Sequence, residues 1–156
     1  TEVAAALEAA TSSGADRIVC VFQPHRYSRT AEVGDAFGPA FRGADLVVIT
    51  DIYSAGEAPR PGVSGKLVAQ SVIDAGAVER VEYVALRSEL AAWLARELTA
   101  GDLCLTLGAG DLTVVPDAGH LSTIDQPAAL SRALGRWLQT CDNNLQEGPG
   151  HEYNFA

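Results

Sequence analysis

The chain has 156 residues, of which 47% are hydrophobic, and a formal net charge of -9 at pH 7. This length suits one domain with a sizeable buried core, and the excess of acidic residues argues against a nucleic acid partner, whose phosphates most of the surface would repel. No apolar run reaches the roughly 20 residues that span a bilayer, and no signal segment opens the chain, so we expect no membrane partner and a cytoplasmic location.

Helix and strand patterns alternate along the chain. Ala-rich or amphipathic runs predict helices over residues 3–10, 30–41, 65–75 and 88–98, and apolar runs predict strands over 17–22, 45–50, 80–85 and 102–107. Strands separated by helices of this length imply right-handed crossovers. We therefore expect an α/β fold with a Rossmann-like, mostly parallel sheet that helices cover on both faces.

Two of these helices have recognisable caps and apolar stripes. Thr30 and Ser88 stand where a side-chain oxygen caps the first turn of a helix. The stripe of the second helix, at i, i+4 and i+8, consists of Val33, Phe37 and Phe41. The stripe of the fourth helix consists of Leu90, Trp93, Leu94 and Leu98.

The last part of the chain has weaker patterns. A late amphipathic helix is predicted over 126–139, whereas residues 141–156 lack periodicity and are expected to form a flexible tail. The sequence thus divides into a domain over 1–140 and a tail over 141–156. Cys20 and Cys104 lie in apolar runs and Cys141 lies in the tail, so we expect free thiols, no disulfide framework and no metal site.

The segment directly after the first strand carries three donor side chains. Pro24 ends the strand by removing a ladder donor, and His25, Arg26 and Arg29 follow it. Ligands of open α/β sheets bind just past the carboxyl ends of the strands, and two guanidinium groups there suit an anion. The alternative is that these arginines only cap carbonyl groups or lie in water.

The second strand is followed by a segment that carries carboxylates. Residues 51–57 include Asp51, Tyr53 and Glu57, and they are expected at the same edge of the sheet. Next to two arginines, the carboxylates suit either a structural ion-pair network or a site for a zwitterion, in which cations hold a carboxylate and anions hold an amine. The sequence leaves both alternatives open.

Two glycine motifs resemble phosphate-binding loops but do not meet their requirements. The first, over 62–66, has Arg60 where the loop needs glycine and Leu67 where magnesium binding needs Ser or Thr. The second, over 108–111, lacks the third glycine of the dinucleotide motif, and Asp111 would repel a pyrophosphate. We expect no phosphate-binding loop at the first motif, and either a tight turn or a wall of the crevice at the second.

Three segments of the chain occur together in one known family. FQPHRYSRT over 22–30, DIYSAGE over 51–57 and GAGD over 108–111 resemble, in order and spacing, the C-terminal domain of the Mur ligases. Within that family they are most similar to the branch that adds L-alanine to UDP-N-acetylmuramate in peptidoglycan synthesis. The resemblance covers about residues 1–115, and the first two residues are similar to the end of the segment that precedes this domain in the family.

The resemblance implies an ATP-dependent amide ligase. ATP phosphorylates the muramoyl carboxylate, and the amine of L-alanine then displaces phosphate from the acyl phosphate. In this family a central domain binds ATP and Mg²⁺, so we expect no cofactor on this chain and no activity from it alone. By the match, Arg26 and Arg29 hold the alanine carboxylate and His25 acts catalytically, orienting the amino acid or stabilising charge. Tyr53 and Glu57 form walls of the substrate site, and the domain closes over the active site.

Two alternatives stay open beside this reading. One is a non-catalytic α/β module that binds a small carboxylate. The other is the related murein tripeptide ligase, which takes a tripeptide in place of L-alanine. The first is favoured if the full-length protein has no nucleotide-binding segment upstream, and the second is separated by the choice of acceptor.

Overall fold

The computed structural model describes residues 1–108, and within them helices and strands alternate as the sequence predicts. The helices are α1 (Glu2–Thr11), α2 (Tyr27–Val33), α3 (Gly65–Ala75) and α4 (Arg87–Glu97), with short 3₁₀ helices η1 (Gly34–Ala36) and η2 (Gly38–Phe41). The strands are β1 (Arg17–Gln23), β2 (Leu46–Ile49), β3 (Arg80–Tyr83) and β4 (Asp102–Gly108).

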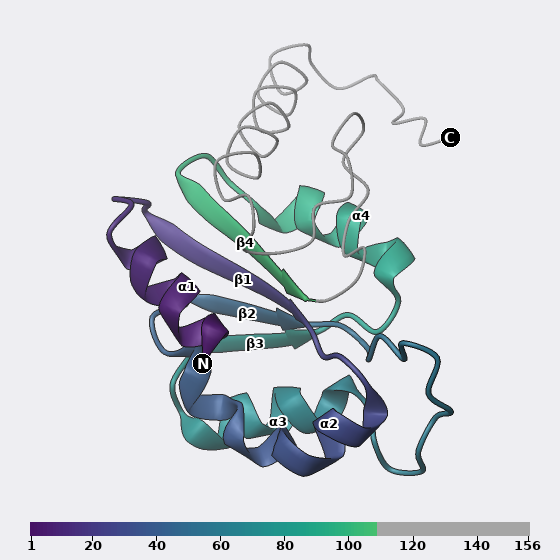
Figure 1. Ribbon diagram of the computed structural model, residues 1–156. Coiled ribbons are helices and arrows are strands. Elements are labelled where there is room, and N and C mark those ends of the chain that lie inside the picture. Colours follow the sequence, from purple (N-terminus) through teal and green to yellow (C-terminus); the bar gives the residue numbers. More distant parts are fainter. Residues whose placement is uncertain (109–156) are drawn as a thin grey trace, which may run out of the picture.

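The four strands form one sheet in the order β3-β2-β1-β4, and each neighbouring pair is parallel. In Figure 1 the arrowheads therefore point toward the same edge, with α1, α2 and α3 on one face and α4 on the other. This arrangement confirms the predicted α/β, Rossmann-like fold with a parallel sheet covered on both faces. It also places β1 and β4 side by side, although β2 and β3 lie between them in the sequence.

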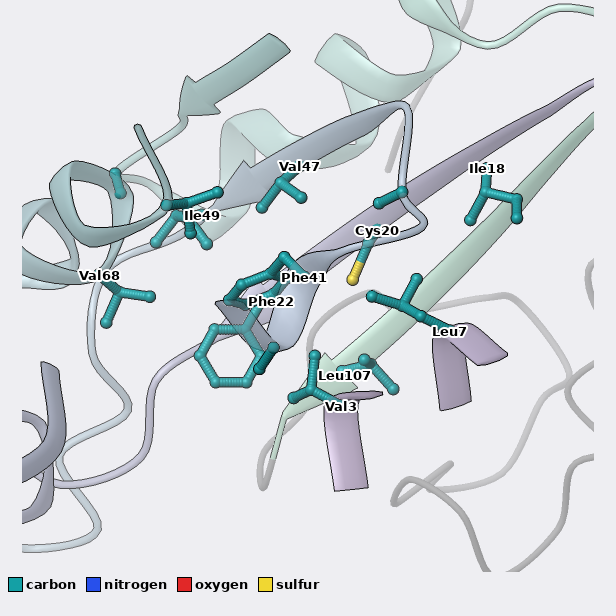
Figure 2. Close-up of a cluster of buried hydrophobic side chains, with 14 of the residues drawn as sticks. Val3, Leu7, Ile18, Cys20, Phe22, Phe41, Val47, Ile49, Val68 and Leu107 are labelled. Carbon is teal, nitrogen blue, oxygen red and sulfur yellow. The ribbon is translucent and has the colours of Figure 1, made fainter. Parts of the chain in front are cut away.

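The two faces of the sheet bury separate hydrophobic clusters. Alternate residues of a strand point to opposite faces, so Cys20 and Phe22 of β1 join the cluster under α1, η2 and α3, which Figure 2 shows. Val19 and Val21 face the other way and pack with Leu90 and Leu94 of α4. Residues of β1 therefore belong to both clusters. Packing on both faces holds the carboxyl end of this strand in place.

The predicted second helix over 30–41 is wrong in its start and in its continuity. Helix α2 begins at Tyr27, and Thr30 is no cap: it lies inside the helix, where its hydroxyl donates to the carbonyl of Arg26. After Val33 the chain continues as two 3₁₀ helices, because Pro39 lacks the N–H that an α-helix needs and Gly38 packs against the backbone of α3.

The predicted stripe of that helix is also only partly buried. Phe41 is fully buried and Phe37 packs against the same cluster, but Val33 is exposed. Helix α4 differs less: it starts at Arg87 after an uncapped Leu86, so Ser88 lies within the helix and caps nothing. Its predicted stripe is confirmed in part. Leu90 and Leu94 are buried, whereas Trp93 and Leu98 are only partly buried.

The two cysteines of the described part are free and buried, as predicted. Cys20 and Cys104 lie in the clusters on opposite faces of the sheet, so they cannot form a disulfide with each other. Burial raises the pKa of Cys104 to about 12, which keeps this thiol protonated and unreactive. Cys141, the helix over 126–139, the domain boundary at 140 and the tail over 141–156 lie outside the described residues.

No helix between residues 1 and 108 has the length and apolarity that crossing a membrane requires.

At the amino ends of the strands an ion-pair network joins four elements. Arg17 of β1 holds both carboxylate oxygens of Asp102 in β4, at 3.0 and 2.6 Å, and reaches Glu97 of α4 at 3.1 Å. Arg80 of β3 binds the same Glu97 at 2.6 Å.

This network gives the domain a predictable response to acid. The hydrogen bonds from Arg17 and the Thr99 N–H overcome the effect of burial and hold the pKa of Asp102 below its ordinary value. Arg80 first, and Arg17 second, do the same for the pKa of Glu97. The unfolded chain thus binds these protons at higher pH than the folded one, so this contribution to stability is present above about pH 4 and is lost as the pH falls below it.

Urea titrations at pH 7, 5 and 3 test this response. The unfolding midpoint should be steady from pH 7 to 5 and lower at pH 3, and Arg17→Met should lower it at pH 7 while flattening the acid dependence. An equally steep loss in the variant would assign the acid response to other carboxylates.

Candidate functional site

A cavity of about 640 Å³ opens at the carboxyl ends of β1 and β4. The chain leaves β1 toward β2 on one side, whereas β4 arrives on the other side after a crossover along the opposite face. Such a switch point is where open α/β sheets bind ligands. Its walls come from the start of α1, the ends of the two strands and the region of α2 and η1, and they include Phe22, Gln23, His25, Arg29, Phe37 and Leu107.

The structure places two of the five predicted site residues in this cavity. His25 and Arg29 line it, whereas Arg26, Tyr53 and Glu57 are not among its lining residues. All five nevertheless belong to two segments that contact each other: one comprises the loop from β1 to α2 and the first turn of α2, which carries Arg29, and the other is the loop that begins after β2. The predicted proximity of these two segments is therefore observed, with different neighbours for different side chains.

Backbone hydrogen bonds join the two loops beyond the ends of the strands. The N–H of Tyr53 donates to the carbonyl of Pro24, and the N–H of Arg26 donates to the carbonyl of Tyr53, each at 2.9 Å. His25 and Tyr53 thereby form a parallel bridge, and their rings stack with centroids 5.8 Å apart and planes 16° apart. The side chain of His25 is thus oriented from the neighbouring loop.

Arg26 occupies a backbone conformation that side chains rarely adopt. Its φ of 66° lies in the left-handed region, and it directly precedes α2 as the N-cap residue. Such a residue costs about 1 to 3 kcal/mol and persists only where its surroundings hold it. Here Tyr53 binds its N–H, while Thr30 donates to its carbonyl from both the backbone and the hydroxyl, at 3.1 and 2.9 Å.

Glu57 connects the second loop to the first turn of α2. One carboxylate oxygen accepts the hydroxyl of Ser28 at 2.6 Å and the other accepts the N–H of Ser28 at 2.9 Å. These bonds are the main reason that the pKa of Glu57 lies below its ordinary value. The loop reaches this position through a turn in which the Glu57 N–H donates to Ser54, with Gly56 at a φ of 86°.

The two arginines keep their positive charge available. Within residues 1–108 neither Arg26 nor Arg29 forms an ion pair with a carboxylate. Asp51 is engaged elsewhere, because its carboxylate accepts the N–H groups of Ile52 and Gly65 at the start of α3. Of the two alternatives that the sequence leaves open, the described part thus lacks the ion-pair network.

The charge and the burial of this loop also set the protonation of His25. Burial is the largest cause that lowers its pKa, and the positive charges of Arg26 and Arg29 lower it further, against a smaller opposite effect of Glu57. An imidazole whose pKa lies below 6.5 is mostly neutral at pH 7. It can then donate a hydrogen bond from one nitrogen and accept one at the other.

Sequence reasoning missed Gln23, which also lines the cavity. Its side chain is buried, and its Oε1 atom has no hydrogen-bond partner. A buried acceptor without a partner is uncommon in folded proteins. A glutamine at the end of a strand has no distinctive spacing, so only its place beside the cavity identifies it as a candidate.

The glycine motif over 62–66 forms the start of a helix. Ser64 is the N-cap of α3, its hydroxyl accepting the Lys66 N–H, and the Lys66 ammonium lies over the Tyr83 ring at 5.6 Å. With Leu67 after the lysine, these residues do not fit a phosphate and its magnesium ion. Gly108 lines the cavity, and the remainder of the GAGD motif lies outside the described residues.

The fold and this crevice define an α/β domain with a cavity at the switch point of its parallel sheet. The chain belongs to the Mur ligase family, since the family model described as "Mur ligase, glutamate ligase domain" matches residues 1–110.

Similar proteins carry one name. The chain is 46% identical over 107 residues to the UDP-N-acetylmuramate–L-alanine ligase of Pelotomaculum thermopropionicum. The matched residues make up 69% of this chain and 23% of that protein. To the protein of the same name from Syntrophotalea carbinolica it is 45% identical over 141 residues, covering 90% of this chain and 27% of that one. The second similarity extends beyond the motifs, which end at residue 111. The chain thus spans about a quarter of the length of these curated relatives.

Proposed function

We propose that this chain is the acceptor-binding domain of an ATP-dependent ligase that joins L-alanine to UDP-N-acetylmuramate. The observation that carries this proposal is the cavity at the carboxyl ends of β1 and β4, where His25 and Arg29 lie beside Arg26 without a carboxylate partner within residues 1–108. The names of the similar ligases supply the substrates.

In the proposed reaction this domain binds and orients the amino acid. Arg26 and Arg29 hold its carboxylate by charge-assisted hydrogen bonds. The neutral imidazole of His25, fixed by Tyr53, orients the amine or stabilises charge at the reacting carbon. The neutral amine attacks the carbonyl carbon of the muramoyl acyl phosphate and the C–N bond forms. The bond from that carbon to the phosphate oxygen breaks, its electron pair leaves with the phosphate, and the nitrogen releases a proton to solvent. Holding a small nucleophile in line with its target can supply several kcal/mol of the barrier.

ATP and Mg²⁺ are proposed to bind mainly on the remaining part of the full-length protein. The basis for this proposal is that the 62–66 motif has Leu67 where magnesium binding needs Ser or Thr, and that its lysine is engaged with Tyr83. This domain then closes over the nucleotide and the muramoyl substrate.

Phosphate release and product mass test the assignment. The full-length protein with ATP, Mg²⁺ and UDP-N-acetylmuramate should release phosphate when L-alanine is added and form the alanyl product, whereas a murein tripeptide should be a poor acceptor. The chain over 1–156, tested alone, should neither hydrolyse ATP nor give a 1:1 isotherm with it at micromolar concentrations.

Each other outcome supports a different function. Preference for the tripeptide would identify the tripeptide ligase. Binding of amino acids without any phosphate release by the full-length protein would favour a non-catalytic carboxylate-binding module.

A further inference from the structure

Helix α2 begins without a cap of its own. Its N-cap residue, Arg26, offers no side-chain hydrogen bond to the first turn. The first N–H groups of a helix have no partner within the helix, and an acidic oxygen is the most favourable external one. Ser28 is the second residue of α2, and its N–H is bound by the carboxylate of Glu57, which comes from a loop 29 residues further along the chain.

This contact lies between the two arginines. Ser28 is two residues after Arg26 and one residue before Arg29, so anything that moves the first turn of α2 moves both guanidinium groups relative to the cavity. The backbone at Arg26 is already strained. It is held by the hydrogen bond from its N–H to the Tyr53 carbonyl and by the two hydrogen bonds that its own carbonyl accepts from Thr30. Glu57 adds a third constraint, two residues after the strained Arg26, through its bonds to Ser28.

We propose that Glu57 is a positioning residue, which caps α2 through Ser28 and so holds Arg26 and Arg29 in the geometry that binds the carboxylate of the acceptor. This inference rests on the proposed function and changes the role expected for Glu57 from the sequence. Both of its carboxylate oxygens are engaged by Ser28. It acts on the substrate through Ser28 and α2, without touching the substrate.

Kinetics of the full-length protein test the proposal. Glu57→Ala should raise the KM for L-alanine by roughly tenfold, because two charge-assisted hydrogen bonds are lost, and should leave the KM for ATP unchanged. Ser28→Ala removes the hydroxyl bond and should raise it less. Glu57→Gln keeps one acceptor oxygen for the Ser28 N–H and should restore part of the loss. Glu79→Ala, an exposed glutamate at the other end of the sheet, is the control and should behave as the parent.

The double variant separates positioning from direct binding. If Glu57 acts through Ser28, adding Ser28→Ala to Glu57→Ala should change the KM no further, whereas fully additive effects would mean that Glu57 contacts the substrate independently, and would overturn the proposal. An unchanged KM in Glu57→Ala would overturn it as well.

Amide hydrogen exchange gives a readout that does not depend on activity. In Glu57→Ala the amide of Ser28 should exchange at least tenfold faster, with the amides of α3 unchanged. Faster exchange in a protein that proves to have no alanine-dependent activity would contradict the proposed function and leave the cap intact. Unchanged exchange would overturn the cap even where the ligase activity is found.

Discussion

Arg26→Ala in the full-length protein is expected to raise the KM for L-alanine by roughly 10- to 150-fold. A charge-assisted hydrogen bond contributes about 1.5 to 3 kcal/mol, and the variant removes the guanidinium group that supplies it. The KM for ATP should change far less, because the phosphate contacts are proposed to lie elsewhere. Arg26→Lys should recover only part of the affinity, since an ammonium group cannot form the planar, two-point contact.

The strained backbone of Arg26 provides a matched control. Arg26→Gly and Arg26→Ala delete the same side chain, but glycine adopts a φ of 66° without strain. The glycine variant should therefore be more stable than the alanine variant by about 1 kcal/mol in urea unfolding, with a similar KM for L-alanine. An unchanged KM in both variants, or a loss confined to ATP, would assign Arg26 a structural role.

Gly65→Ala is expected to destabilise the domain by about 3 kcal/mol, measured by urea unfolding of this chain. Gly65 is the first residue of α3, and a Cβ atom there would overlap the carbonyl oxygen of Thr50 and lie 3.0 Å from the Tyr83 ring. Thr50 directly follows β2 and the Tyr83 ring belongs to β3, so neither can move aside easily. The start of α3 would have to shift, together with the loop that carries Tyr53 and Glu57.

Gly34→Ala is the control for this substitution. Gly34 is also buried, but the nearest atom to an added Cβ is the Leu67 Cβ at 3.7 Å, an ordinary contact. Its stability should stay within about 0.5 kcal/mol of the parent. Equal losses in the two variants would show that the close approach at Gly65 is relieved by movement and does not limit the fold.

The sequence predicts elements best where local and tertiary preferences agree. Helix α3 matches its predicted bounds, because Ser64 caps its start and Gly76, in the left-handed conformation, ends it. The prediction of one continuous second helix was wrong, because Val33, Phe37 and Phe41 keep helical spacing although the α-helix ends at Val33. That break depends on the packing of Gly38 against α3, which is a contact between segments 33 residues apart.

The candidate site divides in the same way. The sequence can place His25, Arg26 and Arg29 at the carboxyl edge of the sheet, because they directly follow an apolar strand. The partner of Glu57 could not be predicted, since it depends on how the loop after β2 folds back onto α2. Gln23 was missed because an unpaired buried oxygen is a property of the packed structure and leaves no pattern in the sequence.

The ion pairs of Arg17 and the cavity lie at opposite ends of β1. The strand has seven residues, which at about 3.3 Å each gives a separation of roughly 20 Å. Substitutions that far apart, without shared partners, have additive effects on free energy. The stability of the domain and the properties of the cavity can therefore be altered independently. Substitutions that strengthen the ion pairs at the amino end of the sheet would raise the stability of the domain. Variants with destabilising substitutions around the cavity could then still fold and be selected.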